Sequence, residues 1–403
     1  MGNKEHKSKF DEDANKSDTK KIDSINPNIL GYGIFKKKQK FSEYICLDYE
    51  IYKLKGIDDK FYFAYICFSY EIEIYKYTFS EKKFVKIGKL NVGLENKRYD
   101  TSGVKIKYCY NSLNNKEYLF MAAGFGETKT VLIKNENKYE LIKKKKKNFE
   151  FEDDEDTKVR RDSISYKFRL TNMNAFFNKY DKLIYIIQTF CRTESSHRGI
   201  INDYFIYLDI FKNNKVKTIY YLEMKQENYI LYENEISNGY NIIFIDDFSS
   251  SIKSIQLETI KEKKKKQLFF RTLLKRYDFN DCYLGCRINF NDKICYLYFF
   301  ERNKVKHKSN LISFDLNKNM IVKPLELNLE IYGITNWLNK YLIINSYNSF
   351  YLFNLKTEQI ILKYNLNLDD RIESMLQFID WNNKFIGLFF LNNNRLECFS
   401  IDR

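Results

Sequence analysis

The chain has 403 residues, of which 44% are hydrophobic, 17% aromatic and 30% charged, a globular composition that excludes disorder over most of its length. Only 14 Gly and 2 Pro exclude collagen-like and Pro-rich architectures, and no apolar run approaches the roughly 18 to 20 residues of a membrane-spanning helix. The net charge of +15 comes mostly from Lys rather than Arg, which weakens a nucleic-acid interpretation, and part of it is typical of an A/T-rich coding genome.

The first segment, residues 1–28, is polar and charged, so it cannot bury enough surface to become ordered. We expect a disordered basic tail, followed by one folded domain over 29–403. The start, Met1-Gly2-Asn3, resembles an N-myristoylation signal at Gly2, although His6 stands where Ser or Thr is preferred. A plain solubilising tail is the alternative. Even an acylated Gly2 would need the neighbouring lysines for stable membrane binding.

Two charged segments, near 143–165 and near 261–267, are predicted to be loop insertions in the folded domain. Both contain candidate anion-binding residues, although runs of like charge are usually solvated loops. These candidates are Lys143, Lys144, Lys145, Lys146 and Lys147 in the first segment and Lys263, Lys264, Lys265 and Lys266 in the second. The first segment also contains Arg160-Arg161-Asp162-Ser163, which resembles a site favoured by basophilic kinases, so Ser163 is a candidate for phosphorylation.

The rest of the chain is a succession of short aromatic and β-branched runs separated by Asn, Asp, Lys and Ser, which predicts strands and turns. One phrase recurs seven times: one or two turn formers, usually a Lys, and then an apolar strand. The residues directly before the seven strands are Lys60, Lys116, Lys182, Asn241, Lys293, Lys340 and Lys384. Their spacings are close to, or a little above, the roughly 40 to 50 residues of a four-stranded propeller blade.

The strand after each turn is apolar on consecutive residues, so we expect both faces of its sheet to be covered. A parallel α/β sheet would need crossover helices, for which the connections are mostly too short and too polar. The last third strand, Arg395–Ile401, leaves an edge that a strand around Phe41–Asp48 could fill. The predicted fold is all-β: a seven-bladed β-propeller of four-stranded antiparallel blades, closed by pairing of an N-terminal strand with the last blade.

Residues 338–361, LNKYLIINSYNSFYLFNLKTEQII, resemble a WD40 repeat, with Phe353-Asn354 in the place of the Trp-Asp pair. Phe314-Asp315 and Leu208-Asp209 are similar. The likeness covers about residues 43–403, but no copy carries Trp-Asp or Gly-His, so the buried Asp/His/Ser network of that family is not carried over. The resemblance to degenerate WD40-like propellers implies a scaffold for protein–protein interactions or a subunit of a larger complex.

No arrangement of residues predicts catalysis, so we expect no enzyme activity, cofactor or metal. Ser196-His197 is interpreted as chance adjacency, because triad partners meet in space rather than in sequence. Cys282 and Cys286 have neither a second Cys pair nor a nearby His pair, which disfavours a zinc site. Eight scattered cysteines and the lack of a signal peptide favour reduced thiols and a cytoplasmic location.

The favoured hypothesis is a non-enzymatic cytoplasmic scaffold that binds other proteins. The alternative is a peripheral membrane or RNA binder that uses the N-terminal tail and the Lys-rich loops, and its binding should collapse as salt rises. A third hypothesis, an enzyme on a propeller scaffold, needs acidic or polar residues at the central channel. The sequence places no channel residues and does not identify a partner.

Overall fold

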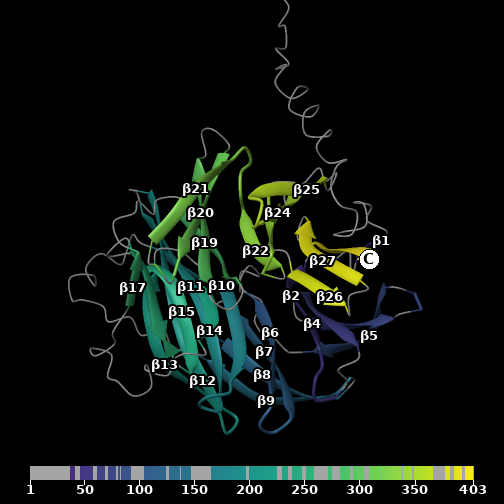
Figure 1. Cartoon of the computed structure of the whole chain (residues 1–403). Helices are drawn as coiled ribbons and strands as arrows, with labels where there is room; N and C mark the ends of the chain where they lie inside the picture. The colour runs from purple at the N-terminus through teal and green to yellow at the C-terminus, as the bar shows by residue number, and fades with distance from the viewer. Residues whose placement is uncertain are drawn as a thin grey trace, which may run out of the picture.

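In the part of the chain that it describes, the computed structural model consists mostly of β-strands, arranged as seven four-stranded sheets (Figure 1). Each recorded strand pairing within these sheets is antiparallel. The structure describes residues 37–402 except 41–45, 58–60, 69–70, 79, 82, 92–103, 124–126, 137, 147–164, 197–198, 225–228, 235–237, 247–250, 258–270, 275–281, 291–293, 304–307, 317, 319, 338, 347–348, 366–376, 382–384 and 393–394.

The first three sheets are numbered in chain order, and each is a run of four consecutive strands. Sheet 1 contains β2 (Cys46–Lys53), β3 (Tyr62–Phe68), β4 (Glu71–Thr78) and β5 (Lys83–Asn91). Sheet 2 contains β6 (Lys105–Asn111), β7 (Lys116–Ala123), β8 (Glu127–Asn135) and β9 (Lys138–Lys146). Sheet 3 contains β10 (Ser165–Asn178), β11 (Leu183–Ser196), β12 (Gly199–Lys212) and β13 (Lys215–Met224).

The other four sheets follow the same order, except that the last combines strands from both ends of the chain. Sheet 4 contains β14 (Ile230–Asn234), β15 (Gly239–Asp246), β16 (Ser251–Gln256) and β17 (Arg271–Leu274). Sheet 5 contains β18 (Cys282–Phe290), β19 (Ile294–Asn303), β20 (Lys308–Asp315) and β21 (Met320–Leu327). Sheet 6 contains β22 (Gly333–Trp337), β23 (Tyr341–Asn345), β24 (Ser349–Asn354) and β25 (Gln359–Asn365). Sheet 7 contains β26 (Gln377–Trp381), β27 (Phe385–Asn392), β28 (Arg395–Asp402) and β1 (Lys37–Lys40).

Each of the seven apolar runs found in the sequence forms the second strand of a sheet, which explains why these runs are apolar on consecutive residues. Successive side chains of a strand point to opposite faces, and in sheets 2 to 5 both faces are covered by a neighbouring sheet. In β7, Leu119 lies in the core shared with sheet 1, whereas Phe120 lies in the core shared with sheet 3. The same alternation separates Phe299 from Phe300 in β19.

Five hydrophobic cores join sheets 1 to 6 in chain order. Each core combines side chains from two successive sheets, and the side chains of sheet 7 lie outside the described residues. The pairs that represent the five cores are Phe63 and Leu119, Phe120 and Ile186, Ile187 and Phe244, Ile245 and Phe299, and Phe300 and Ile344.

The first strands of neighbouring sheets meet on the inner side of the stack, where β2 contacts β6, β6 contacts β10, and β18 contacts both β14 and β22. Two ion pairs give the relative direction of β2 and β6, because Asp48 pairs with Lys105 and Glu50 with Lys107. The residue numbers rise together, so these two strands run in the same direction. Their sheets therefore present corresponding turns at the same end.

The N-terminal strand that pairs with the last sheet is β1, with Lys37 opposite Ser400 and Lys40 opposite Glu397. Figure 1 shows β1 beside the C-terminus. The predicted segment, Phe41–Asp48, was wrong in position, because its last residues begin β2. The alternating pattern of β2 suits an innermost strand, where Asp48 and Glu50 find lysine partners on β6. A polar strand such as β1 suits an outer edge.

The prediction that Lys143–Lys147 form a loop was also wrong for most of that run. Lys143 to Lys146 belong to β9, the outermost strand of sheet 2, and lie opposite Thr130 to Glu127 of β8. An outer strand tolerates consecutive lysines because charged residues at a sheet edge discourage pairing with other chains. Lys147 lies outside the described residues, as do Gly2, Ser163 and all of Lys263–Lys266.

Candidate functional site

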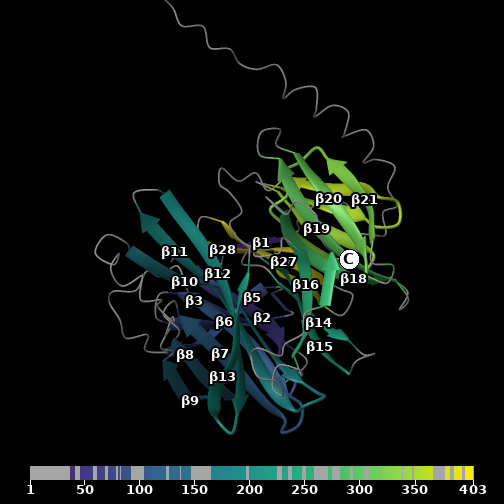
Figure 2. The same cartoon turned by 90° about the vertical axis from the view of Figure 1, so that its left-hand side faces the viewer.

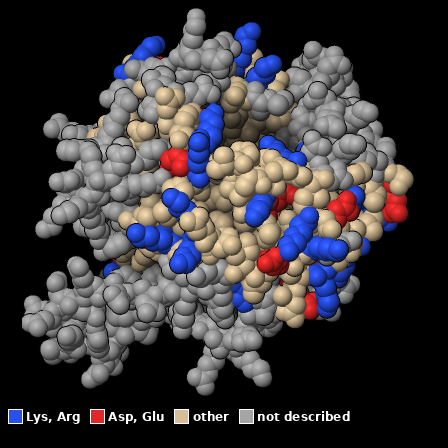
Figure 3. All heavy atoms as spheres, turned by 90° about the horizontal axis from the view of Figure 1, so that it is seen from below, with Lys and Arg blue, Asp and Glu red and all other residues tan. Residues whose placement is uncertain are grey.

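The candidate site is one end of the molecule, where the connections between first and second strands and between third and fourth strands lie. We call this end the turn face, and it is defined by the described turns at 112–115, 179–182, 213–214, 339–340 and 355–358. The hairpins between β8 and β9 and between β12 and β13 are at the bottom of Figure 1, and Figure 3 looks at the molecule from that side.

The turns of this face are built around asparagine and aspartate. The positive φ angles of Asn115, Asn214 and Asn339 are 53°, 57° and 53°, a backbone conformation that asparagine tolerates well. Side-chain oxygens then accept backbone N–H groups within the turn: Asn354 Oδ1 lies 2.9 Å from the Lys356 nitrogen, and Asp181 Oδ1 lies 3.1 Å from the Leu183 nitrogen. Asparagine thus takes up the left-handed backbone conformation in these turns, and Asn and Asp side chains bond the turn backbone.

A buried carboxylate braces the turns of sheets 1 and 2. Glu117, only 1% exposed, accepts the backbone N–H groups of Lys55 at 2.6 Å and Gly56 at 3.1 Å. It also accepts the Tyr108 hydroxyl at 2.7 Å. Gly56 allows this approach, because a Cβ there would lie 3.1 Å from the Asn115 side chain and 3.2 Å from its carbonyl oxygen. The negative charge of Glu117 is thus neutralised by hydrogen bonds from Lys55, Gly56 and Tyr108 within the protein.

A second carboxylate braces sheets 3 and 4. Glu233, near the end of β14, accepts the Tyr180 hydroxyl at 2.6 Å and lies 2.5 Å from the Lys179 ammonium. Hydrogen bonds from Lys179 and then Tyr180 hold the pKa of Glu233 below its ordinary value. Tyr180 also packs edge to face against Tyr240, with ring centroids 6.1 Å apart. The β10–β11 turn is therefore fixed against the neighbouring sheet.

The lysines that recur before the second strands remain on the outside. Lys116, Lys182 and Lys340 are exposed, and none of them forms an ion pair with any described residue. Leu113, in the same turn as Lys116, leaves 63% of its surface exposed. Figure 3 shows Lys and Arg side chains spread across the described part of this side, with most acidic side chains next to a basic one. The turn face thus combines unpaired positive charge with an exposed apolar side chain.

The ion pairs on the innermost strands join β2 to β6 and so stabilise the contact between sheets 1 and 2. Glu50 and Lys107 are 2.5 Å apart and mostly buried, with exposed fractions of 14% and 22%. Burial raises the pKa of Glu50 while the Lys107 charge opposes that effect. Burial also opposes the charged form of Lys107, but the Glu50 and Asp48 charges outweigh it and raise its pKa. Each charge has an opposite partner, so this pair offers no free acid or base to a substrate.

Sheet 3 differs from the others in length. Strands β10, β11 and β12 have 14 residues each, whereas the remaining strands have 4 to 10. Figure 2 shows the three long strands together, above the labelled strands of sheet 2. Their far end, at the β11–β12 connection, is opposite the turn face because antiparallel strands alternate in direction.

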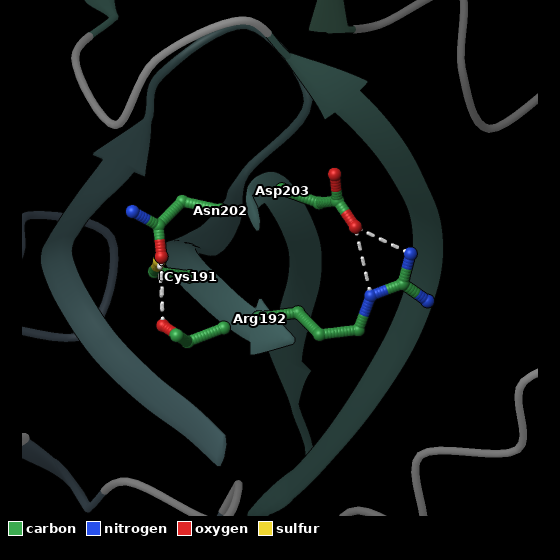
Figure 4. Close-up of polar contacts among 5 residues, drawn as sticks. Cys191, Arg192, Asn202 and Asp203 are labelled. Carbon is green, nitrogen blue, oxygen red and sulfur yellow. Dashed lines mark hydrogen bonds and ion pairs between the residues drawn. The ribbon is translucent and has the colours of Figure 1, made fainter. Parts of the chain in front are cut away.

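Cross-strand polar contacts hold this extension together (Figure 4). On one side of the hairpin, Arg192 Nε and Nη2 donate to Asp203 Oδ2 at 3.0 and 2.5 Å, and the guanidinium lies 5.3 Å from the Phe205 ring. On the other side, the Thr193 hydroxyl donates to Asn202 Oδ1 at 2.8 Å. Facing residues Arg192 and Asp203, and Thr193 and Asn202, keep the strands in register.

The structure separates the two cysteines considered for a metal. Cys282 packs in the core between sheets 4 and 5, whereas Cys286 packs against the core between sheets 5 and 6. A bulge between Leu284 and Cys286 accompanies this change of side. Among the described residues, no group of three or more His, Cys, Asp or Glu side chains is placed to hold a metal ion. His6, His197 and His307 lie outside those residues.

The sequence could not identify the two braces, because Glu117 and Glu233 act on residues 53 to 62 positions away and belong to no local motif. The recurrent lysines, by contrast, were visible as part of the repeated phrase.

Within the described ranges, none of the helical residues forms an apolar segment long enough to cross a membrane.

The fold is that of known β-propellers. The chain is similar to Sqt1 of Saccharomyces cerevisiae, with 7% identity, a TM-score of 0.52, and coverage of 91% of this chain and 98% of that one. It is also similar to BBS1N, solved in complex with ARL6DN, with 12% identity, a TM-score of 0.51, and coverage of 91% and 95%. No family model matches the sequence, and no curated protein matches it. These similarities establish a β-propeller fold alone.

Proposed function

We propose that the protein is a non-enzymatic scaffold that binds an acidic surface of a partner protein on its turn face. The observation that carries the proposal is the recurrence of exposed lysines without an ion-pair partner at the same turn of sheets 2, 3 and 6, namely Lys116, Lys182 and Lys340. Two acidic side chains at this end, Glu117 and Glu233, are used in bracing the sheets. Complementary charge speeds association and selects partners.

Exposed apolar surface favours a protein as the partner. Leu113 projects from the same turn as Lys116, and Met320, which follows the β20–β21 turn, is 51% exposed. Protein interfaces combine apolar contacts at their centre with polar groups at the rim. The complex of BBS1N with ARL6DN supports the idea that such a fold serves protein binding, as an analogy of fold.

The proposal includes a finer architecture than the shared fold. We take the seven sheets as the blades of one closed, WD40-like ring, in which β1 completes the last blade. The pairing of β1 with β28 and the five cores between sheets 1 and 6 support this arrangement. The thiols of Cys67 and Cys109, which form no disulfide, are compatible with the proposed cytoplasmic location.

Two double variants test the proposal. Lys116→Glu with Lys182→Glu reverses two charges on the turn face, and Lys89→Glu with Lys308→Glu reverses two charges at the opposite strand ends. Tagged proteins are recovered from native lysate, and stoichiometric partners are identified by mass spectrometry. We expect the wild type and the second variant to retain a protein partner that the first variant loses.

Three other outcomes would contradict the proposal. A partner retained by the Lys116→Glu/Lys182→Glu variant would place the binding surface elsewhere, and the absence of any stoichiometric partner would contradict a scaffold. Salt-sensitive binding of the wild type to phosphatidylserine vesicles or to RNA, with no protein partner, would instead favour a lipid or RNA binder.

A further inference from the structure

An exposed apolar patch lies on the outer strands of sheets 5 and 6. In the described part of the chain, five large apolar side chains are exposed, and three of them are on these two strands. Met320 and Val322 of β21 expose 51% and 49% of their surface, and Ile360 of β25 exposes 38%. The other two, Leu113 and Leu141, belong to sheet 2. We call Met320, Val322 and Ile360 the rim patch.

The rim patch faces the side on which sheets 5 and 6 meet. Ile360 lies opposite Phe353, which packs in the core between these sheets, so both side chains are on that face. Met320 lies opposite Asp315, and the residue before Asp315 packs toward sheet 4, so Met320 points toward sheet 6. Val322 follows Met320 by two residues and shares its face. The three side chains therefore point toward the same interface between two sheets.

The core between sheets 5 and 6 extends outward toward the rim patch. Leu325 of β21 and Tyr351 of β24 pack against that core and are partly buried. Met320 begins β21 and Ile360 is the second residue of β25, so the patch is at the turn-face end of both strands. An apolar group bound there would enlarge a core that already exists, and exposed apolar patches of this kind mark interaction sites.

Positive charge borders the rim patch on sheet 6. Lys340, before β23, and Lys356, in the 355–358 turn, are both exposed. Lys363 of β25 lies opposite Tyr351, so it is on the same face as the patch. None of these three lysines forms an ion pair with a described residue. Glu358 is the one acidic residue of the turn, so positive charge prevails beside the patch.

We propose that the rim patch binds an amphipathic acidic segment of a partner protein. The apolar face of the segment would cover Met320, Val322 and Ile360, and its carboxylates would lie toward the lysines. Amphipathic helices are recognised in this way, by an apolar surface that accepts one face of the helix. The inference rests on the function proposed above, because it names the kind of partner segment that this end of the molecule takes.

Charge and area favour a partner segment over a second copy of the chain. The chain carries a net charge of +15, so two copies repel each other, whereas an acidic segment is attracted. Contact through three side chains would also bury far less than the roughly 1,200 Å² of a specific interface between two folded proteins. A short segment needs only a small apolar patch with complementary charges beside it.

Met320 provides a probe of its own surface. The other methionines with described side chains, Met121, Met173 and Met224, are at most 2% exposed. Peroxide converts an accessible thioether to the sulfoxide, and mass spectrometry of peptides from the full chain locates the product. We expect Met320 to be oxidised at least about tenfold faster than Met173, because only Met320 is open to the reagent. Equal rates would mean that the patch is covered in the folded chain and would overturn the proposal.

The binding test adds a synthetic helical peptide with Leu on one face and Glu on the other. At a peptide concentration about ten times the Kd found by titration, oxidation of Met320 should slow about tenfold, since only the free protein reacts. A scrambled peptide of the same composition has no apolar face and serves as the control. No slowing, or equal slowing by the scrambled peptide, would overturn the proposal.

Two double variants locate the interaction while leaving Met320 in place. Val322→Asp with Ile360→Asp changes the rim patch, and Leu113→Asp with Leu141→Asp makes the same change at exposed apolar positions of sheet 2. All four side chains are exposed, so both variants should melt like the wild type. The first should bind the peptide at least about tenfold more weakly, because a carboxylate pays a desolvation cost in an apolar contact. Unchanged binding by the first variant would contradict binding at the patch.

The charge assignment has its own pair of variants. Lys356→Glu with Lys363→Glu should weaken peptide binding by about threefold or more, a sum of modest surface-charge effects. Lys89→Glu with Lys308→Glu changes the net charge equally at distant strand ends and should bind like the wild type. Equal weakening in both would show that net charge alone attracts the peptide. Without peptide, oxidation of Met320 that slows as protein concentration rises would assign the patch to a second copy and overturn the proposal.

The rim patch and the proposed function can fail separately. Native lysate is compared for the wild type, the Val322→Asp/Ile360→Asp variant and the Lys116→Glu/Lys182→Glu variant, and we expect both variants to lose the partner. A partner lost only from the lysine variant would overturn the rim patch and leave the proposed function intact. A partner lost only from the rim variant would support the rim patch and contradict the role of the lysines of sheets 2 and 3.

Discussion

Tyr52 of β2 stacks on Tyr108 of β6, with ring centroids 3.6 Å apart and ring planes 11° apart. The contact joins sheets 1 and 2 where their first strands run side by side. The Tyr108 hydroxyl also donates to the buried Glu117 carboxylate, so one side chain contributes both an aromatic contact and a hydrogen bond to a charge.

Substitution of Tyr108 should separate these two contributions. Tyr108→Phe keeps the ring and loses the hydrogen bond to a charged group, which should lower the free energy of unfolding by about 1.5–3 kcal/mol. Tyr108→Leu also loses the aromatic pair and should cost about 0.5–1.5 kcal/mol more. Urea unfolding followed by tyrosine fluorescence measures both values. Equal stability of Tyr108→Phe and the wild type would show that the hydrogen bond contributes nothing.

The Glu233 brace should make stability depend on acid pH. Its pKa is lowered from 4.5 by the bonds to Lys179 and Tyr180, so its contribution is present above pH 4.5 and is lost as pH falls through the lower folded value. Glu233→Gln removes this titration. We expect the thermal midpoint of the variant to lie below that of the wild type at neutral pH and to approach it in acid. Parallel pH profiles would contradict the assigned role.

Removal of β1 should weaken the structure at the junction of the two chain ends. A chain that lacks residues 1–40 loses the pairing with β28, whereas a chain that lacks residues 1–36 retains it and serves as the control. The first deletion should cost on the order of 2–4 kcal/mol, about 1 kcal/mol for each ladder hydrogen bond lost. Calorimetry compares the two truncated proteins. Identical unfolding profiles would argue against closure by β1.

The buried thiols should resist alkylation in the native protein. Burial raises the pKa of Cys67 to about 12 and also raises that of Cys109, so both stay protonated at neutral pH. Iodoacetamide should modify them slowly in the native chain and rapidly in denaturant, as measured by peptide mass spectrometry. A native rate for Cys67 close to its denatured rate would indicate that sheet 1 opens readily.

Much of the architecture could be predicted because the second strands of sheets 2 to 5 are packed between two neighbouring sheets. That environment requires apolar residues on consecutive positions, as with Leu119 and Phe120, and such runs are visible in sequence. The turns could also be predicted from the sequence, because asparagine tolerates the positive φ angle that a tight hairpin needs. Asn115 and Asn339 have this conformation in the structure. The second strands and the turns could therefore be predicted, because the residue types within each segment determine them.

The missed features depend on neighbours far along the chain. The polar sequence of β1 gives no strand signal and becomes a strand only beside β28. Lys143–Lys146 also looked like a loop, because their place in β9 depends on the pairing with β8. The extension of β11 and β12 was hidden as well, since the polar run from Arg192 to Ser196 gives no strand signal by itself and forms a strand opposite Gly199–Asp203.

The pairing of Lys37 with Ser400 has a consequence for biosynthesis. A ribosome delivers the chain from its N-terminus, so β1 emerges first and must wait for its partner until almost the last residue has been made. Sheets 1 to 6 can assemble in that interval, whereas sheet 7 cannot be completed before β28 has been made. We therefore expect newly made protein to depend on chaperones until translation ends.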